Sequence, residues 1–314
     1  MSTTFISNDV GTQASGALSR RSRTRRRLSF SPWLFCVPAL ALLVIFLVIP
    51  FAMAAQLSLT NQRLTSPLPR RWIGLENYRE IFADAEFRRA VLNNLVFAAV
   101  IVPVQTGLAL GLALIVNQKI RGIAFFRVLF FTPVVMGIAV ASTVWFLLFD
   151  PSRGLVNGVL RVLSWGNVHP RWLDSTSTAL PAIMIVSVWA SVGFQMVVLL
   201  AGLQDVSTDL YEAASVDGAR PRTQFRYITL PAMRNTLVFV LTMTTIFSFR
   251  LFDQVYIMTQ GGPLGHTDTM LLELVKVGYE RQQVARACAI AVVFFTFVVV
   301  ITVFQRLVIK EDET

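Results

Sequence analysis

The sequence predicts an all-α membrane protein with six transmembrane helices, and three observations carry that prediction. Of the 314 residues, 54% are hydrophobic and only 15% are charged, whereas a soluble domain usually carries about 25% charged residues. Six long apolar stretches recur along the chain. A cluster of six arginines precedes the first stretch. Together these features exclude a soluble globular protein.

Each apolar stretch is long enough to cross a bilayer as a helix. About 20 helical residues span a hydrocarbon core about 30 Å thick, and a backbone in lipid must satisfy its own hydrogen bonds. Prolines fall in or beside several stretches, which membrane helices tolerate. The stretches are residues 33–57, 91–116, 124–149, 180–203, 236–259 and 286–307.

The arginine cluster at residues 20–27 predicts the orientation in the membrane. A basic segment beside an apolar run favours a cytoplasmic N-terminus, and six spans then return the C-terminus to the cytoplasm. The alternatives are a nucleic-acid arm or a signal peptide cleaved near Ala52-Met53-Ala54. The apolar run exceeds the 7–15 residues typical of a signal peptide, and we expect membrane lipid rather than nucleic acid as the partner.

The predicted parts are a cytoplasmic tail (1–32), a six-helix domain (33–309), a cytoplasmic C-terminal tail (310–314) and outward-facing segments 58–90, 150–179 and 260–285.

Residues typical of catalysis or metal binding are scattered along the chain. Cys36 and Cys288 lie in separate apolar runs, and His169 and His266 lie alone in outer segments. No phosphate-binding G-x-x-x-x-G-K-[ST] motif occurs, and the loops are too short to hold an ordinary catalytic domain. We therefore predict no catalytic residues, no metal site and no cofactor bound by this chain.

The inner segment at about 204–235 carries the most informative pattern. Ser207 can cap the start of a helix, Gly218 suits its end, and Pro221 discourages continuation. This predicts a short helix of about three turns with a small-residue face at Ala213, Ala214 and Ala219, followed by a second apolar stripe. A plain amphipathic linker explains that stripe but not the alanines and the Asp-Gly pair at this spacing.

The same segment resembles the EAA loop of the membrane subunits of binding-protein-dependent ABC importers. The family pattern is E-A-A-x-x-D-G-A followed by F-x-x-I-x-L-P. Asn235 departs from it where the family often has a second proline. The matching positions are Glu212, Ala213, Ala214, Asp217, Gly218, Ala219, Phe225, Ile228, Leu230 and Pro231.

Two outer motifs extend the resemblance to carbohydrate importers. The segment from Trp72 to Tyr78 is similar to the family's outer segment after the first helix. Phe252-Asp253, then Thr259 to Pro263, resemble the end of helix five in the MalF/UgpA-type subunit. The chain departs from that subfamily at Arg281-Gln282-Gln283, where an Ala-Phe pair is common after Tyr279.

The resemblance implies the type I permease fold of ABC importers and a set of partners. A second, MalG/UgpE-type permease subunit would complete the path, and an extracytoplasmic binding protein would deliver the solute. Two cytoplasmic ATPase subunits would bind ATP and Mg and move the EAA helices, with Glu212 facing a basic residue of the ATPase. The implied location is the cell (inner) membrane of a bacterium or archaeon.

Polar residues inside the helices are candidates for lining the solute path, because they are costly in lipid. A tryptophan beside hydrogen-bonding groups suits a sugar, and the resemblance implies that the solute contacts lie on helices four and five. For any single Ser or Thr, hydrogen bonding between helices is the simpler explanation. The candidates are Ser187, Trp189, Ser191 and Gln195 in helix four, and Thr242, Thr244, Thr245, Ser248 and Arg250 in helix five.

Arg250 is a cation well inside an apolar segment. We expect it to pair with Asp253, three residues on; the alternative is contact with an anionic solute. Within helix two, Gly107 and Gly111 predict close helix packing, within the chain or between subunits.

The predicted function is thus a permease subunit for a carbohydrate or related polyol, or alternatively for glycerol phosphate esters. An ion-coupled secondary transporter is the rival from another class, and a membrane enzyme is a weaker one.

Overall fold

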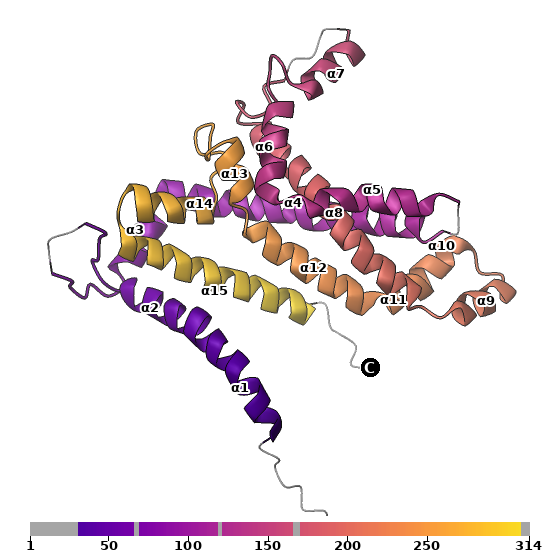
Figure 1. The fold of residues 1–314 in the computed structure, drawn as a ribbon, viewed down its shortest axis with the longest axis horizontal. Helices are drawn as coiled ribbons and strands as arrows, with labels where there is room; N and C mark the ends of the chain where they lie inside the picture. Colours follow the sequence, from indigo (N-terminus) through magenta and orange to yellow (C-terminus); the bar gives the residue numbers. More distant parts are fainter. Residues whose placement is uncertain (1–30, 66–68, 119–120, 166–169, 309–314) are drawn as a thin grey trace, which may run out of the picture. The chain divides into compact units, whose positions relative to one another are not determined.

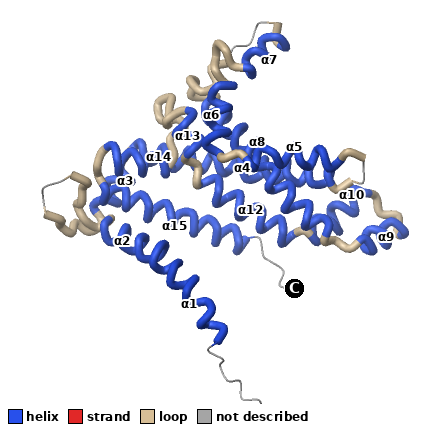
Figure 2. Tube along the Cα trace, in the orientation of Figure 1, coloured by secondary structure: helices blue, strands red, loops and turns tan. Residues whose placement is uncertain are grey.

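A computed structural model describes residues 31–65, 69–118, 121–165 and 170–308. The regular elements of these residues are all helices, with one isolated bridge between Thr60 and Trp72 (Figure 2). The chain divides into two units, residues 1–49 and residues 50–314, described in turn. The arginine cluster and the C-terminal tail 310–314 lie outside the described residues, as does His169.

The first apolar stretch forms one long helical run. It comprises α1 (Ser31–Leu43), a π-helical turn (Val44–Val48) and α2 (Ile49–Leu57). From Cys36 to Leu57 it is long and apolar enough to cross a membrane. The side chains from Cys36 to Met53 are exposed, Phe46 by 74%, which suits a helix surrounded by lipid.

The second unit is built around α4 (Ala85–Val116), α8 (Ala179–Gln204) and α12 (Arg234–Phe249), with α15 (Val284–Val308) against α12 (Figure 1). Alanines on α4 let the helices approach closely, and Ala109 and Ala113 are fully buried against Met196 and Leu199. Methionine and leucine fill the spaces left between these helices.

A glycine in α8 permits another close approach. A Cβ on Gly193 would lie 2.0 Å from the carbonyl oxygen of Phe130, so only glycine fits where α5 (Ile123–Val135) crosses α8. Gly107 and Gly111 behave differently: an added Cβ at either position would meet no described atom within 4 Å. The packing expected of this pair is therefore not made within the described part of the chain.

The stretch 124–149, predicted as one helix, is broken. α5 is followed by α6 (Ile138–Leu148) at an angle of 99°. Met136 and Gly137, between the two helices, have extended backbones. Pro133 lies in the last turn of α5, which its missing N–H weakens. Five single helices and this bent pair give up to six spans in the described residues, which confirms the predicted fold class.

The fifth apolar stretch is interrupted as well. α12 ends at Phe249, and α13 (Asp253–Met258) begins after a short non-helical segment. The two helices together still make one candidate span, Arg234–Met258.

Short helices lie outside the spans. They are α3 (Glu76–Ala83), α7 (Leu155–Leu163), α9 (Thr208–Val216), α10 (Pro221–Gln224), α11 (Leu230–Ala232) and α14 (Met270–Val275), with π-helical turns at Phe225–Thr229 and Lys276–Glu280.

Candidate functional site: a coupling segment and a polar cavity

The coupling segment, residues 204–235, begins with α9, whose two ends are fixed by local hydrogen bonds. The Ser207 side chain accepts a bond from the backbone N–H of Asp209. At the other end Gly218 has φ +77°; its N–H bonds to Ser215 O at 3.1 Å, and the N–H of Ala219 bonds to Ala214 O at 2.8 Å. These two bonds form a Schellman motif. The predicted cap and helix end are thus both present.

The small-residue face differs from the prediction in one respect. α9 ends at Val216, so Ala219 lies beyond the helix and only Ala213 and Ala214 lie on it. The reason is the left-handed backbone of Gly218, which turns the chain before another helical turn can form.

α9 has no buried residue. Glu212, Ala213, Asp217 and Gly218 are exposed, and Val216 is 88% exposed. A helix that buries nothing within its own chain gains little from tertiary packing, on which short helices depend. Its shape suits contact with another protein.

Side-chain hydrogen bonds join α9 to the segment that leads into α12. The hydroxyl groups of Tyr211 and Thr229 lie 2.9 Å apart. Gln224 Nε2 donates to Ser215 Oγ at 3.0 Å and to Ala219 O at 3.2 Å. Phe225, Ile228 and Leu230 are half-buried on this connection, and Pro231 is exposed. α9 is therefore joined by hydrogen bonds to the connection that leads into α12.

A cavity of about 350 Å³ lies between α4, α8, α12 and α13. It brings together five of the nine predicted path residues. Trp189, Gln195, Thr242 and Thr245 do not line it; Trp189 packs edge-on against Trp145, with ring centroids 5.5 Å apart. The five that line the cavity are Ser187, Ser191, Thr244, Ser248 and Arg250.

Several of these polar groups are engaged in bonds between helices. Gln195 Nε2 donates to Thr244 Oγ1 at 2.6 Å, and Ser187 Oγ donates to Gln254 Oε1 at 2.8 Å. The oxygen of the Gln195 amide is buried with no hydrogen-bond partner in the structure. Thr244 and Thr245 also donate to backbone carbonyls one turn earlier. The same residues therefore stabilise the bundle and present polar atoms near the cavity.

The expected pair between Arg250 and Asp253 is wrong for this structure. Both side chains are exposed and line the cavity, but no ion pair joins them among the described residues. The helical spacing of three residues does not apply, because α12 ends at Phe249 and α13 starts at Asp253. The cavity therefore contains one cationic and one anionic group, each exposed to it.

Sequence reasoning missed two glutamines at this cavity. Gln105, 3% exposed on α4, and Gln254 on α13 both line it. Gln105 stands two residues after Pro103 in an otherwise apolar run, a signal that could have drawn attention to it.

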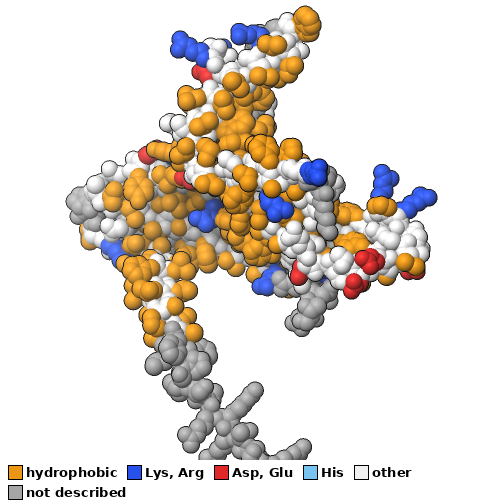
Figure 3. Space-filling model, turned by 45° about the vertical axis from the view of Figure 1, so that its right-hand side comes forward, with side chains coloured by type: hydrophobic (Ala, Val, Ile, Leu, Met, Phe, Trp, Pro, Cys, Tyr) orange, Lys and Arg blue, Asp and Glu red, His pale blue; other side chains and the backbone are white. Residues whose placement is uncertain are grey.

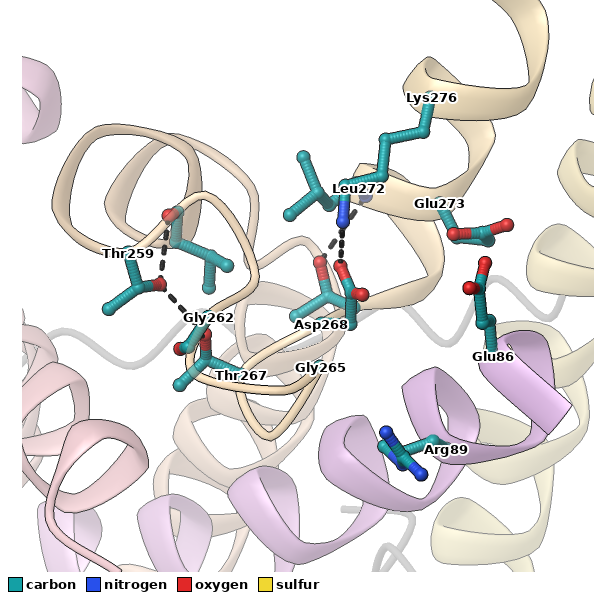
Figure 4. A network of polar contacts seen from close by, with 12 residues as sticks. Glu86, Arg89, Thr259, Gly262, Gly265, Thr267, Asp268, Leu272, Glu273 and Lys276 are labelled. Atoms are coloured by element: carbon teal, nitrogen blue, oxygen red, sulfur yellow. Dashed lines mark hydrogen bonds and ion pairs between the residues drawn. The ribbon is translucent and has the colours of Figure 1, made fainter. Parts of the chain in front are cut away.

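The outer segment 260–286 holds a buried charged cluster (Figure 4). Asp268 accepts a charged hydrogen bond from Lys276 at 2.7 Å. Glu273 is 1% exposed, with Arg281 at 3.4 Å. Burial raises the pKa of Glu273 to about 7, against the favourable charge of Arg281. Burial raises the pKa of Asp268 too, opposed by the bond from Lys276.

The Arg281-Gln282-Gln283 departure has a structural role in this chain. Arg281 bonds Glu86 at 2.5 Å, and Gln282 accepts a bond from Thr65. The Thr259–Pro263 motif is closed by Thr267, whose hydroxyl lies 2.7 Å from Thr259 Oγ1 and donates to Gly262 O. Arg281 and Gln282 thus join the outer segment to distant parts of the chain, whereas the Thr267 bonds are local.

The second unit has interrupted spans, a helix, α9, that buries none of its residues, and a polar cavity between its helices. These features are typical of a membrane permease subunit. Residues 86–311 match the family model described as "Binding-protein-dependent transport system inner membrane component". The chain belongs to that family and is a multi-pass inner-membrane protein.

Relatives of known name are similar over most of their length. The trehalose/maltose transport system permease protein MalF of Thermococcus litoralis is 32% identical, covering 90% of this chain and 94% of the relative. The diacetylchitobiose uptake system permease protein NgcF of Streptomyces coelicolor is 36% identical, covering 88% and 81%. A chain of a bacterial ABC transporter involved in alginate import has the same fold, with a TM-score of 0.78 at 21% identity over 91% of this chain and 96% of that chain.

Proposed function

We propose that this chain is the permease subunit of an ATP-driven importer for a carbohydrate or related polyol. Two permease subunits form the path, two ATPase subunits bind ATP and Mg in the cytoplasm, and an external binding protein delivers the solute. The observation that carries the proposal is α9: a capped helix with the EAA-type residues that is bonded to the connection leading into α12 and buries nothing in its own chain. The names of the relatives support the carbohydrate class.

In this proposal the movement of the ATPases reaches the cavity through the coupling segment. Glu212 meets a basic residue of the ATPase, while Ala213, Ala214 and Gly218 allow close contact. Because the joint from Tyr211 to Thr229 is short and bonded, closing of the ATPase dimer shifts α12 as a unit. That shift exposes the cavity alternately to the two sides of the membrane, with both termini in the cytoplasm.

Uptake by the complete transporter in proteoliposomes tests the proposal. Maltose, diacetylchitobiose and glycerol 3-phosphate serve as probes, each with a binding protein that recognises it. We expect uptake to require ATP and to continue when an ionophore has dissipated the ion gradients. Uptake driven by an ion gradient without ATP would overturn the proposal in favour of a secondary transporter.

A second candidate solute, a glycerol phosphate ester, is favoured by one observation: Arg250 faces the cavity without an ion pair to Asp253. Arg250→Gln separates the two solutes. For a neutral sugar, uptake should remain within about twofold, since only a charge that is costly in lipid is removed. For an anionic solute, uptake should fall by more than about tenfold, because a charge-assisted bond is lost. Asp253→Asn is the matched control from the same cavity wall.

A further inference from the structure

The short outer helix α7 turns its apolar residues away from the protein. Leu155, Val159, Val162 and Leu163 fall at intervals of four, three and one, which places them on one face of the helix. They are 67%, 50%, 77% and 73% exposed, respectively. A groove of about 680 Å³ runs along the helix between Pro151 and Leu163.

The orientation of α7 is fixed by a buried asparagine on its opposite side. Asn157 Nδ2 donates to Pro151 O at 3.2 Å and to Pro170 O at 3.0 Å. Its Oδ1 accepts a bond from Trp172 Nε1 at 2.9 Å. The helix cannot rotate its apolar stripe inward without breaking all three bonds. The polar side chain therefore faces the protein and the apolar ones face outward, the reverse of a helix surrounded by water.

The position of α7 follows from the aromatic side chains that hold it. Trp172 packs on Phe149, directly after α6, with ring centroids 5.3 Å apart, and it lies seven residues before the start of α8. Tryptophans gather where hydrocarbon meets water. This places α7 beside the outer ends of two membrane helices, at the level of the bilayer surface.

The exposed apolar surface continues from α6 onto α7. On α6, Val140 and Leu147 are exposed by 59% and 64%. Figure 3 shows hydrophobic side chains along the column formed by α6 and over α7, with Lys and Arg side chains near its end. The charges of residues 151–165 are those of Arg153 and Arg161, and the stretch contains no acid. A positive, acid-free segment is complementary to anionic head groups.

We propose that α7 lies in the outer surface of the bilayer, with its apolar stripe among phospholipid acyl chains and its two arginines at the phosphate groups. Continuity with the apolar surface of α6 favours lipid over a protein partner, since hydrocarbon already surrounds the adjoining surface. The inference does not depend on which solute the permease carries.

Spin labels at single cysteines test this placement in the full-length protein, purified with its associated subunits and placed in lipid nanodiscs. In a Cys36→Ala and Cys288→Ala background, labels are introduced at Val159→Cys, Val162→Cys and, as the matched control on the polar side, Arg161→Cys. We expect the ratio of oxygen to nickel-chelate accessibility at the two stripe positions to be at least about threefold higher than at the control, because oxygen concentrates in hydrocarbon. Two stripe positions guard against a defect specific to one variant.

Two results would overturn the proposal. Equal ratios at all three positions would place the stripe in water. Labels at both stripe positions that are inaccessible to oxygen and to the nickel chelate, or become so only when the binding protein is added, would show that a protein covers the stripe. Nanodiscs of phosphatidylcholine and of phosphatidylglycerol form the two lipid arms. The stripe labels, measured with Arg153 and Arg161 both present, should lie deeper in phosphatidylglycerol, and stripe labels exposed to water in both lipids would contradict the assignment.

Discussion

The coupling segment around α9 and the outer segment 260–286 both connect membrane spans, but they are built in opposite ways. α9 buries no residue and is stabilised by its own caps and by bonds to the next turn of chain. The outer segment buries Glu273 and Asp268 and is joined by charged bonds to residues of α4. A connection that finds its partners within the chain belongs to the fold of that chain. A connection that exposes a well-formed helix has the surface of that helix available for contact with another molecule.

The largest effect should come from the coupling segment. Glu212→Lys should lower uptake by more than about a hundredfold, because like charges across a protein contact cost several kcal/mol. Insertion and thermal stability should stay unchanged, since Glu212 is exposed. Glu212→Gln is the matched control and should retain more uptake. Normal uptake by the Lys variant, with the ATPase still associated, would contradict the role of α9.

Substitutions at Gly218 test the same segment, because they separate two roles of this glycine: close contact with the ATPase and termination of α9. An added Cβ there meets no described atom within 4 Å, but the φ of +77° disfavours other residues. Asparagine tolerates this backbone better than most. If close contact with the ATPase matters, Gly218→Asn and Gly218→Leu should both lose uptake. If only the end of the helix matters, Gly218→Asn should retain uptake while Gly218→Leu loses it.

The outer segment should respond in stability instead. Lys276→Met leaves Asp268, whose side chain is 10% exposed, without its cation. Removing one member of a largely buried ion pair costs about 3 kcal/mol or more, so the thermal unfolding temperature in detergent should fall. The double variant Lys276→Met, Asp268→Leu should recover part of that loss. An unchanged unfolding temperature in the single variant would mean that this cluster does not stabilise the fold.

The comparison also separates what the sequence could predict from what it could not. The caps of α9 were predictable because Ser207 and Gly218 act on neighbouring backbone groups. The charged surroundings of Glu273 were not, because Arg281, 3.4 Å from Glu273, also bonds Glu86, nearly two hundred positions earlier. Arg250 and Asp253 were expected to pair only because the helix was assumed to continue between them.

The bend in the third span and the two unpacked glycines of α4 were also only partly predictable from local sequence. Pro133 and Gly137 are visible in the sequence, but neither predicts the 99° angle between α5 and α6. The spacing of Gly107 and Gly111 predicts close approach, and nothing in it says which molecule approaches.

A pH dependence of stability should follow from Glu273. Its pKa is about 7 in the folded protein, against 4.5 for an ordinary glutamate. The folded state therefore binds more protons than the unfolded state between these values, and stability should fall as pH rises from about 4.5 to about 7. The slope is at most about 1.4 kcal/mol per pH unit. Glu273→Gln should flatten the profile and raise stability at pH 7.5.

The smallest effect should come from the hydrogen bond between Gln195 and Thr244, which belongs to neither segment but supports the path between them. The bond is 2.6 Å long, and both side chains are buried. Hydrogen bonds between membrane helices contribute about 0.6 kcal/mol on average, because the unfolded chain in the membrane also finds partners. A double-mutant cycle of Gln195→Leu and Thr244→Val, followed by thermal unfolding in detergent, should give a coupling near that value. Uptake measured on the same variants then shows whether these groups also touch solute: a loss of transport much larger than the loss of stability indicates that they do. A coupling near zero with normal uptake would remove both residues from the path and from the packing of the bundle.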